Sequence, residues 1–195
     1  MSYLRLLRQQ CLKHRARVLG YCLMTNHIHL VVIPPKEDSL NLAIGRTHFL
    51  YTQHINRLHG RSGHLWQGRF HSCAMDEAYT MAAMRYIERN PVHAKMTRVP
   101  WTYRWSSAEA HASGNDNADI LDMRAWEDMI DAANWKELLT QREDKETVVA
   151  LRLNSQTGRP LASDSFLSKL ERRLGRRLRP LPVGRPRKPE KAKPK

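Results

Sequence analysis

The feature that most constrains the fold is a pair of apolar runs separated by two turn residues. The first run, VLGYCLM, covers residues 18–24, and the second, HIHLVVI, covers residues 27–33. Thr25 and Asn26 stand between them, and this short polar spacing predicts a tight turn. Two prolines follow the second run at 34–35 and end it. We therefore expect a β-hairpin over residues 18–33.

Two histidines open the second predicted strand. Because residues i and i+2 of a strand point to the same face, His27 and His29 are expected to lie side by side, while Ile28 points into a core. Two imidazoles in this arrangement can share a divalent metal ion. The spacing alone leaves a second interpretation open, in which the two histidines are an ordinary surface pair.

Helical periodicity appears on both sides of the hairpin. Residues 2–16 and 39–58 predict amphipathic helices, and residues 65–75 predict extended structure. A further helix is expected to begin after Asp76 and to end at Asn90, before a proline. Tyr86 and Asn90 share one face of that helix, because they are four residues apart. Their position leaves two interpretations, a functional pair or a packed tyrosine and a helix stop.

The charge of the chain points to a polyanionic partner. The formal net charge is +14, and residues 171–195 hold 11 Lys and Arg against two Glu. Such an excess favours nucleic acid as the partner. The three cysteines are odd in number and form no CxxC pair, which favours a reducing compartment. With no membrane-length apolar run and no signal-peptide core, we expect a cytoplasmic protein.

Composition divides the chain into three predicted parts. Residues 1–112 carry the motifs, residues 113–179 predict a helical C-terminal extension, and residues 180–195 predict a disordered basic tail. The tail contains GRPRK, in which Arg185 and Arg187 are candidate DNA contacts. This stretch resembles the core of a minor-groove AT-hook, and a generic basic tail is the alternative.

Three ordered motifs carry a resemblance to a known family. YCLMTNHIHLVV, SGHLWQGRF and MRYIERNPVHA, within residues 5–110, resemble the REP-associated tyrosine transposases. These belong to the single-tyrosine HUH transposases of insertion sequences, where HUH stands for two histidines around a bulky apolar residue. The segment TGRPLASDSFLSKLERRLGRRL also resembles the C-terminal region of many members.

The resemblance implies a fold and a reaction. The fold would be α+β, with a ferredoxin-like antiparallel sheet and helices on one face. The chain begins inside the family's first helix, so the usual first strand is expected to be missing and a sheet edge exposed. The resemblance implies Tyr86 as the nucleophile, and Tyr79 is the fallback because it lies two turns earlier on nearly the same helical face. It implies His27, His29 and Asn90 as ligands of Mg²⁺ or Mn²⁺.

The remaining family motif supplies candidate DNA contacts. In GHLWQGRFH, Trp66 is expected either to stack on an unpaired base or to cap the core, and Arg69 to reach a phosphate. The expected partner is single-stranded or hairpin DNA, with no membrane and with the number of subunits left open.

Three functions remain in competition. The first is a DNA transposase that nicks and rejoins single strands at hairpin-bearing repeats through a 5′-phosphotyrosyl intermediate. The second is an inactive, domesticated protein that binds repeat hairpins. The third is a metal hydrolase with a water nucleophile, for which no acidic cluster stands near the two histidines.

Overall fold

The computed structural model describes residues 2–129, 134–180 and 184. In these residues, helices surround one small two-stranded sheet. The first half of the chain supplies both strands and three helices: α1 (Tyr3–His14), β1 (Arg17–Leu23), β2 (Ile28–Ile33), the π-helical turn η1 (Asn41–Gly45), α2 (Arg46–Leu58) and α3 (Glu77–His93). The described residues of the second half form helices without a strand: η2 (Pro100–Thr102), α4 (Ala108–Ser113), α5 (Met123–Met129), α6 (Trp135–Thr140), α7 (Lys145–Thr157) and α8 (Asp164–Leu174).

The predicted hairpin is confirmed. Strands β1 and β2 pair antiparallel, and the Met24 N–H donates to the His27 carbonyl over 2.9 Å to close the turn. The register is irregular between Val18 and Gly20. A Cβ atom at Gly20 would lie 2.6 Å from Met84 Sδ. Glycine at this position therefore allows α3 to approach the sheet closely.

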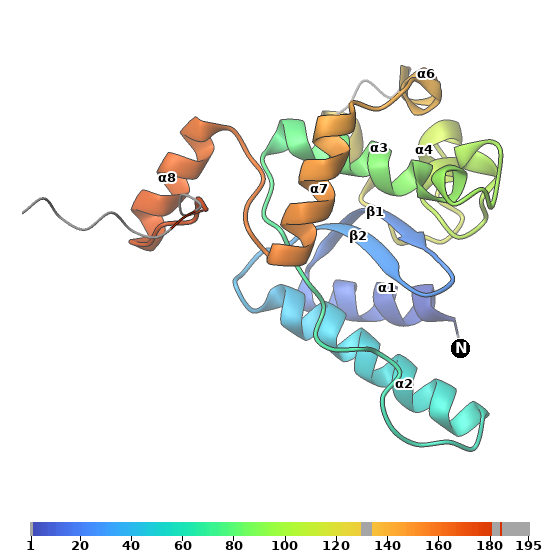
Figure 1. The fold of residues 1–195 in the computed structure, drawn as a ribbon. Coiled ribbons are helices and arrows are strands. Elements are labelled where there is room, and N and C mark those ends of the chain that lie inside the picture. The colour runs from blue at the N-terminus through green and yellow to red at the C-terminus, as the bar shows by residue number, and fades with distance from the viewer. Residues whose placement is uncertain (1, 130–133, 181–183, 185–195) are drawn as a thin grey trace, which may run out of the picture.

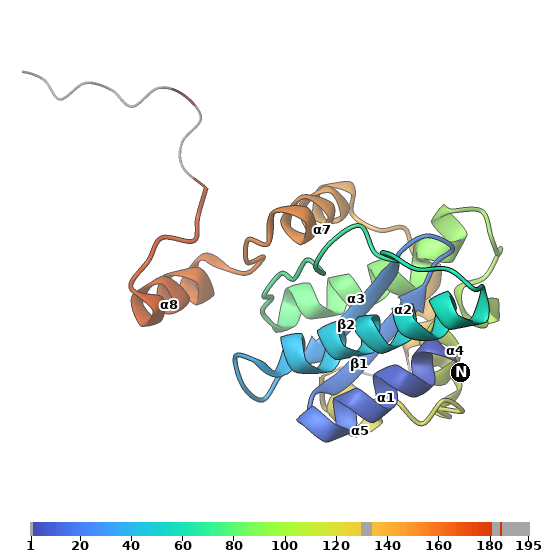
Figure 2. The same ribbon diagram turned by 90° about the horizontal axis from the view of Figure 1, so that it is seen from below.

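Helices cover both faces of the hairpin, so the prediction of helices on one face only is wrong. Helices α1 and α2 lie on one face, and α3 lies on the other (Figures 1 and 2). The smaller core contains Leu7, Val18 and Ile44, with Leu30 packed against it. The larger core contains Val31 and, on the α3 side, residues of that helix. The almost unbroken apolar sequence of β2 fits burial on both faces.

The two outer edges of the sheet differ. On the β1 edge, the Leu23 N–H donates to the Trp105 carbonyl over 2.8 Å, and the Ser107 N–H donates to the Tyr21 carbonyl over 2.9 Å. On the β2 edge, the described residues add no further strand to the sheet. The fold is therefore α+β with a two-stranded sheet whose one edge stays open.

Helix α3 begins as predicted and ends later than predicted. The Asp76 carboxylate accepts the Ser163 N–H over 2.7 Å and the Tyr79 N–H over 3.1 Å, and these bonds, the first most strongly, hold the pKa of this carboxyl below its usual range. The helix continues through Pro91 to His93. Pro91 is fully buried, so packing compensates for the backbone N–H that proline lacks. The predicted end at Asn90 is wrong for this reason.

A cluster of buried polar groups ties α3 to the following helices. We define the buried cluster as Glu88, Ser107, His111 and Trp135. One carboxylate oxygen of Glu88 accepts from Ser107 Oγ and from His111 Nδ1, each over 2.5 Å. The other oxygen accepts from Trp135 Nε1 over 2.9 Å. Because a buried carboxylate needs such partners, these bonds fix the position of α3 against α4 and α6.

The C-terminal helices contribute to the core of the first part of the chain. The larger core, which holds Leu19 of β1, also contains Trp126, Trp135, Leu139 and Leu151. Helix α8 lies apart from this body and has no buried residue (Figure 1). Within the described ranges, no helix combines the length and apolar character that crossing a bilayer requires. Arg185 and Arg187 lie outside the described residues.

Candidate active site

The two histidines lie together at the start of β2. His29 pairs with Cys22 across the hairpin, and His27 is the last residue of the turn. Their ring centroids are 4.8 Å apart and the rings are nearly perpendicular. His27 is exposed, and its Nδ1 lies 2.7 Å from the Asn26 side-chain oxygen. The side-by-side placement predicted from the i and i+2 spacing is present.

Helix α3 brings its two predicted residues to the second of these histidines. The Asn90 side-chain amide donates to His29 Nε2 over 2.8 Å, and the Tyr86 ring lies edge-on to His29 with centroids 5.8 Å apart. Burial, and to a smaller degree His27, lowers the pKa of His29 to about 4. His29 is therefore neutral near pH 7. We call His27, His29, Tyr86 and Asn90 the site cluster.

The site cluster offers donors that suit a divalent metal ion. A neutral imidazole presents a nitrogen lone pair, and His29 already directs Nε2 at the Asn90 amide. Turning that amide would present its oxygen instead, which gives two nitrogen donors and one oxygen donor. No group of three His, Cys, Asp or Glu residues forms a metal cluster in the part of the chain that the structure describes. The donor set here thus depends on an asparagine.

Two basic side chains lie at the Tyr86 ring in addition to the site cluster. Arg152 of α7 donates from Nε to Tyr86 Oη over 3.2 Å. His93 lies two turns further along α3, and its ring centroid is 6.5 Å from that of Tyr86. The His93 Nε2 atom is 2.7 Å from Glu143 Oε2. Sequence reasoning missed Arg152, His93 and Glu143. The i and i+7 spacing of Tyr86 and His93 was a readable signal, whereas the 66 residues between Tyr86 and Arg152 gave none.

The fallback tyrosine occupies a different part of the helix. Tyr79 lies in the first turn of α3, where its backbone N–H donates to the capping carboxylate of Asp76. Its ring is partly buried and packs against the larger core. Of the two tyrosines considered, Tyr86 is the one in ring contact with His29.

The two predicted DNA contacts of the GHLWQGRFH motif have different surroundings. Trp66 stacks on His48 with ring centroids 4.1 Å apart, and its Nε1 donates to the His48 carbonyl over 3.2 Å. The indole also packs against the smaller core beside Tyr3. Arg69, three residues later, is exposed. These contacts give Trp66 a packing role and leave Arg69 accessible to solvent.

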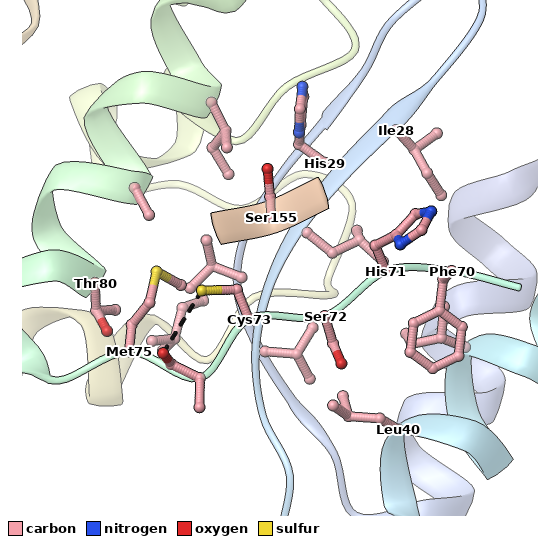
Figure 3. A pocket seen from close by; sticks show the side chains of 18 of the residues that line it. Ile28, His29, Leu40, Phe70, His71, Ser72, Cys73, Met75, Thr80 and Ser155 are labelled. Atoms are coloured by element: carbon pink, nitrogen blue, oxygen red, sulfur yellow. Dashed lines mark hydrogen bonds between the residues drawn. The ribbon is translucent and has the colours of Figure 1, made fainter. Parts of the chain in front are cut away.

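A cavity of about 520 Å³ adjoins the site cluster along the open edge of β2. His29 and Tyr86 line it together with mainly apolar side chains of β2 and of residues 70–75. Figure 3 shows His29 of β2 and Ser155 of α7 in one part of this cavity, and Leu40 and Phe70 in another. The site cluster is therefore reached from a hollow rather than from a flat surface.

Comparison with known proteins agrees with the resemblance in its broader form. Residues 2–90 match the family model described as "Transposase IS200 like". This segment, just under half of the chain, is thus similar to the IS200-like transposases, and it contains the whole site cluster together with Trp66 and Arg69. No curated protein and no solved structure matches the chain. The match supports the transposase family, and association with REP sequences stays a prediction.

Proposed function

We propose that this protein is a REP-associated single-tyrosine transposase, which nicks and rejoins single-stranded DNA at hairpin-bearing repeats. The observation that carries the proposal is the contact of Tyr86 and Asn90 with His29, because it joins residues of two separate motifs within the segment similar to IS200-like transposases. A tyrosine beside two imidazoles and an amide fits a nucleophile beside a phosphate-binding centre.

The proposed reaction is a phosphoryl transfer to Tyr86. The bond between Tyr86 Oη and phosphorus forms while the bond from phosphorus to the 3′ oxygen breaks. The phenol proton passes to solvent, and the departing 3′ oxygen takes up a proton to become a 3′-OH. The 5′-phosphotyrosyl link preserves the bond, so rejoining to another 3′-OH requires no ATP.

The chain's own residues have distinct parts in this reaction. His27, His29 and Asn90 would hold Mg²⁺ or Mn²⁺, which supplies charge neutralisation at a non-bridging phosphate oxygen when bound. The shared face of α3 orients Tyr86 and Asn90 toward the same point, and orientation is a large part of phosphoryl-transfer catalysis. Arg69, which is exposed, would contact a DNA phosphate, and the basic tail with Arg185 and Arg187 would add salt-sensitive affinity.

The proposal is tested by trapping the covalent intermediate. Labelled hairpin oligonucleotides with single-stranded flanks are incubated with the protein and Mn²⁺, and a denaturing gel separates protein–DNA adducts from free DNA. We expect an adduct from the wild-type protein and from Tyr79→Phe, and none from Tyr86→Phe. An adduct that persists in Tyr86→Phe and disappears in Tyr79→Phe would move the nucleophile two turns earlier. Hairpin binding without any adduct would instead identify a non-cutting DNA-binding protein.

A further inference from the structure

The side chain of Arg152 makes a contact that the three family motifs do not include. Its Nε donates to Tyr86 Oη over 3.2 Å, and its guanidinium carbon lies 5.7 Å from the Tyr86 ring centroid. Arg152 is on α7, outside the segment similar to the IS200-like transposases. The atom that it touches is the one that forms the new bond in the proposed reaction.

The position of Arg152 is fixed by the helix that carries it. Asp144 caps α7 by accepting the Thr147 N–H over 2.8 Å, and Gly158 ends the helix in the left-handed conformation. Leu151 is buried in the larger core, and Ser155 lines the cavity beside His29. Helix α7 is therefore anchored on the body, so its exposed Arg152 is held over Tyr86.

The guanidinium group retains donors for a ligand. Only Nε is engaged in the part of the chain that the structure describes, and the two Nη groups make no hydrogen bond there. Arg152 is exposed, so these groups are accessible. Glu143, the acid paired with His93 beside the Tyr86 ring, is also paired with Arg89, and Arg152 itself forms no ion pair with a described residue. An anion arriving at Tyr86 Oη would thus meet an unpaired cation with a planar set of donors, which is the geometry that binds phosphate well.

We propose that Arg152 is a further catalytic residue, which holds Tyr86 Oη through Nε and binds the scissile phosphate through its Nη groups. This inference rests on the proposed function, because it assigns Arg152 to the same transfer. As the Tyr86 oxygen–phosphorus bond forms and the bond to the 3′ oxygen breaks, negative charge spreads over the phosphate oxygens. A fixed guanidinium beside them stabilises that charge more in the transition state than in the ground state.

The test compares adduct formation by Arg152→Ala, Arg152→Lys and Lys145→Ala with that of the wild-type protein. Lys145→Ala is the matched control, since it removes the same charge from the same exposed helix. We expect Arg152→Ala to form the adduct about 100-fold more slowly, as for loss of one donor at a developing oxyanion. Arg152→Lys should recover part of the rate, and Lys145→Ala should stay within about twofold of wild type because its charge lies two helical turns away.

Two further measurements separate catalysis from packing. Millimolar guanidinium ion should restore part of the rate of Arg152→Ala without accelerating Lys145→Ala. In the uncleaving Tyr86→Phe background and without added metal, a neutral methylphosphonate at the scissile position should weaken binding more when Arg152 is present than when Arg152 is alanine. An adduct rate in Arg152→Ala equal to that of wild type would overturn the role of Arg152 while leaving the transposase proposal intact. The absence of adduct from wild type would overturn both.

Discussion

Helix α3 carries two polar clusters on opposite faces, and they differ in how far solvent reaches them. In the buried cluster, both carboxylate oxygens of Glu88 are hydrogen-bonded and no part of the side chain reaches solvent. In the site cluster, Tyr86 is partly exposed and His27 is exposed. The same helix thus presents on one side a carboxylate whose two oxygens are both hydrogen-bonded and closed to solvent, and on the other side a site whose Tyr86 and His27 solvent reaches.

The difference separates the requirements of folding from those of chemistry. A buried carboxylate is tolerated only where its partners are fixed, so the buried cluster defines how α3 sits against α4 and α6. A site that exchanges ligands must instead keep groups available to them. Substitution of a residue in the buried cluster should therefore change stability, whereas substitution of a residue in the site cluster should change reactivity.

The largest expected effect is on the chemistry of the site cluster. His27→Ala should lower the rate of DNA cleavage about 1000-fold or more, because the proposed metal loses one of three protein ligands. Hairpin affinity should change little, since it depends mainly on basic side chains. Gel assays of cleavage and binding on the same hairpin measure both quantities. Cleavage at the wild-type rate would show that the two histidines are a surface pair.

The opposite pattern is expected for the buried cluster. Glu88→Ala should lower the free energy of unfolding by about 3–5 kcal/mol, because it leaves the buried donors of His111 and Trp135 without their acceptor and leaves Ser107 only the Tyr21 carbonyl. Denaturant unfolding monitored by tryptophan fluorescence measures this change. The control is Glu88→Gln, which keeps an acceptor oxygen and should lose less. Equal stability of Glu88→Ala and wild type would remove the distinction between the two clusters.

A smaller loss is expected where α3 meets the sheet. Gly20→Ala places a Cβ atom 2.6 Å from Met84 Sδ and 3.2 Å from Ser107 Oγ. The methionine end is flexible, so we expect a destabilisation of about 1–3 kcal/mol. Thermal unfolding of the single variant and of Gly20→Ala/Met84→Ala provides the comparison. Gly20→Ala should lower stability less when Met84→Ala is already present. An equal loss of stability in both backgrounds would show that the strain does not arise from Met84.

A further expected effect is a dependence of stability on mild acid. Burial lowers the pKa of His29 and of His48 from 6.5 to about 4. Between these values the unfolded chain binds protons that the folded chain does not, so stability should fall as the pH drops from 6.5 toward 4. Thermal unfolding from pH 7 to pH 4.5 measures the slope. His48→Gln should reduce the slope, and an unchanged slope would assign it to other groups.

Local sequence signals predicted the parts of the site that lie close together along the chain. The hairpin followed from two apolar runs around Thr25 and Asn26, and the start of α3 followed from Asp76. The shared face of Tyr86 and Asn90 required only the helical period. In each case the determining contacts span a few residues, so a sequence pattern contains them.

The parts that sequence did not predict depend on contacts between distant segments. Glu88 finds Trp135 across 47 residues, and Arg152 reaches Tyr86 across 66. The continuation of α3 through Pro91 also depends on burial of that proline by tertiary packing. Helix propensity does not contain this information, because tertiary packing overrides it.

The shared core limits how this protein can be divided. Trp126, Trp135, Leu151 and Leu161 fill the same interior as the strands and α3, although all four lie beyond the segment similar to transposases. A fragment ending near residue 112 would lose those side chains and expose the apolar surface that they cover. Helix α3 and residues 113–161 therefore share one interior, and we expect a fragment that lacks the second segment to be less stable than the whole chain.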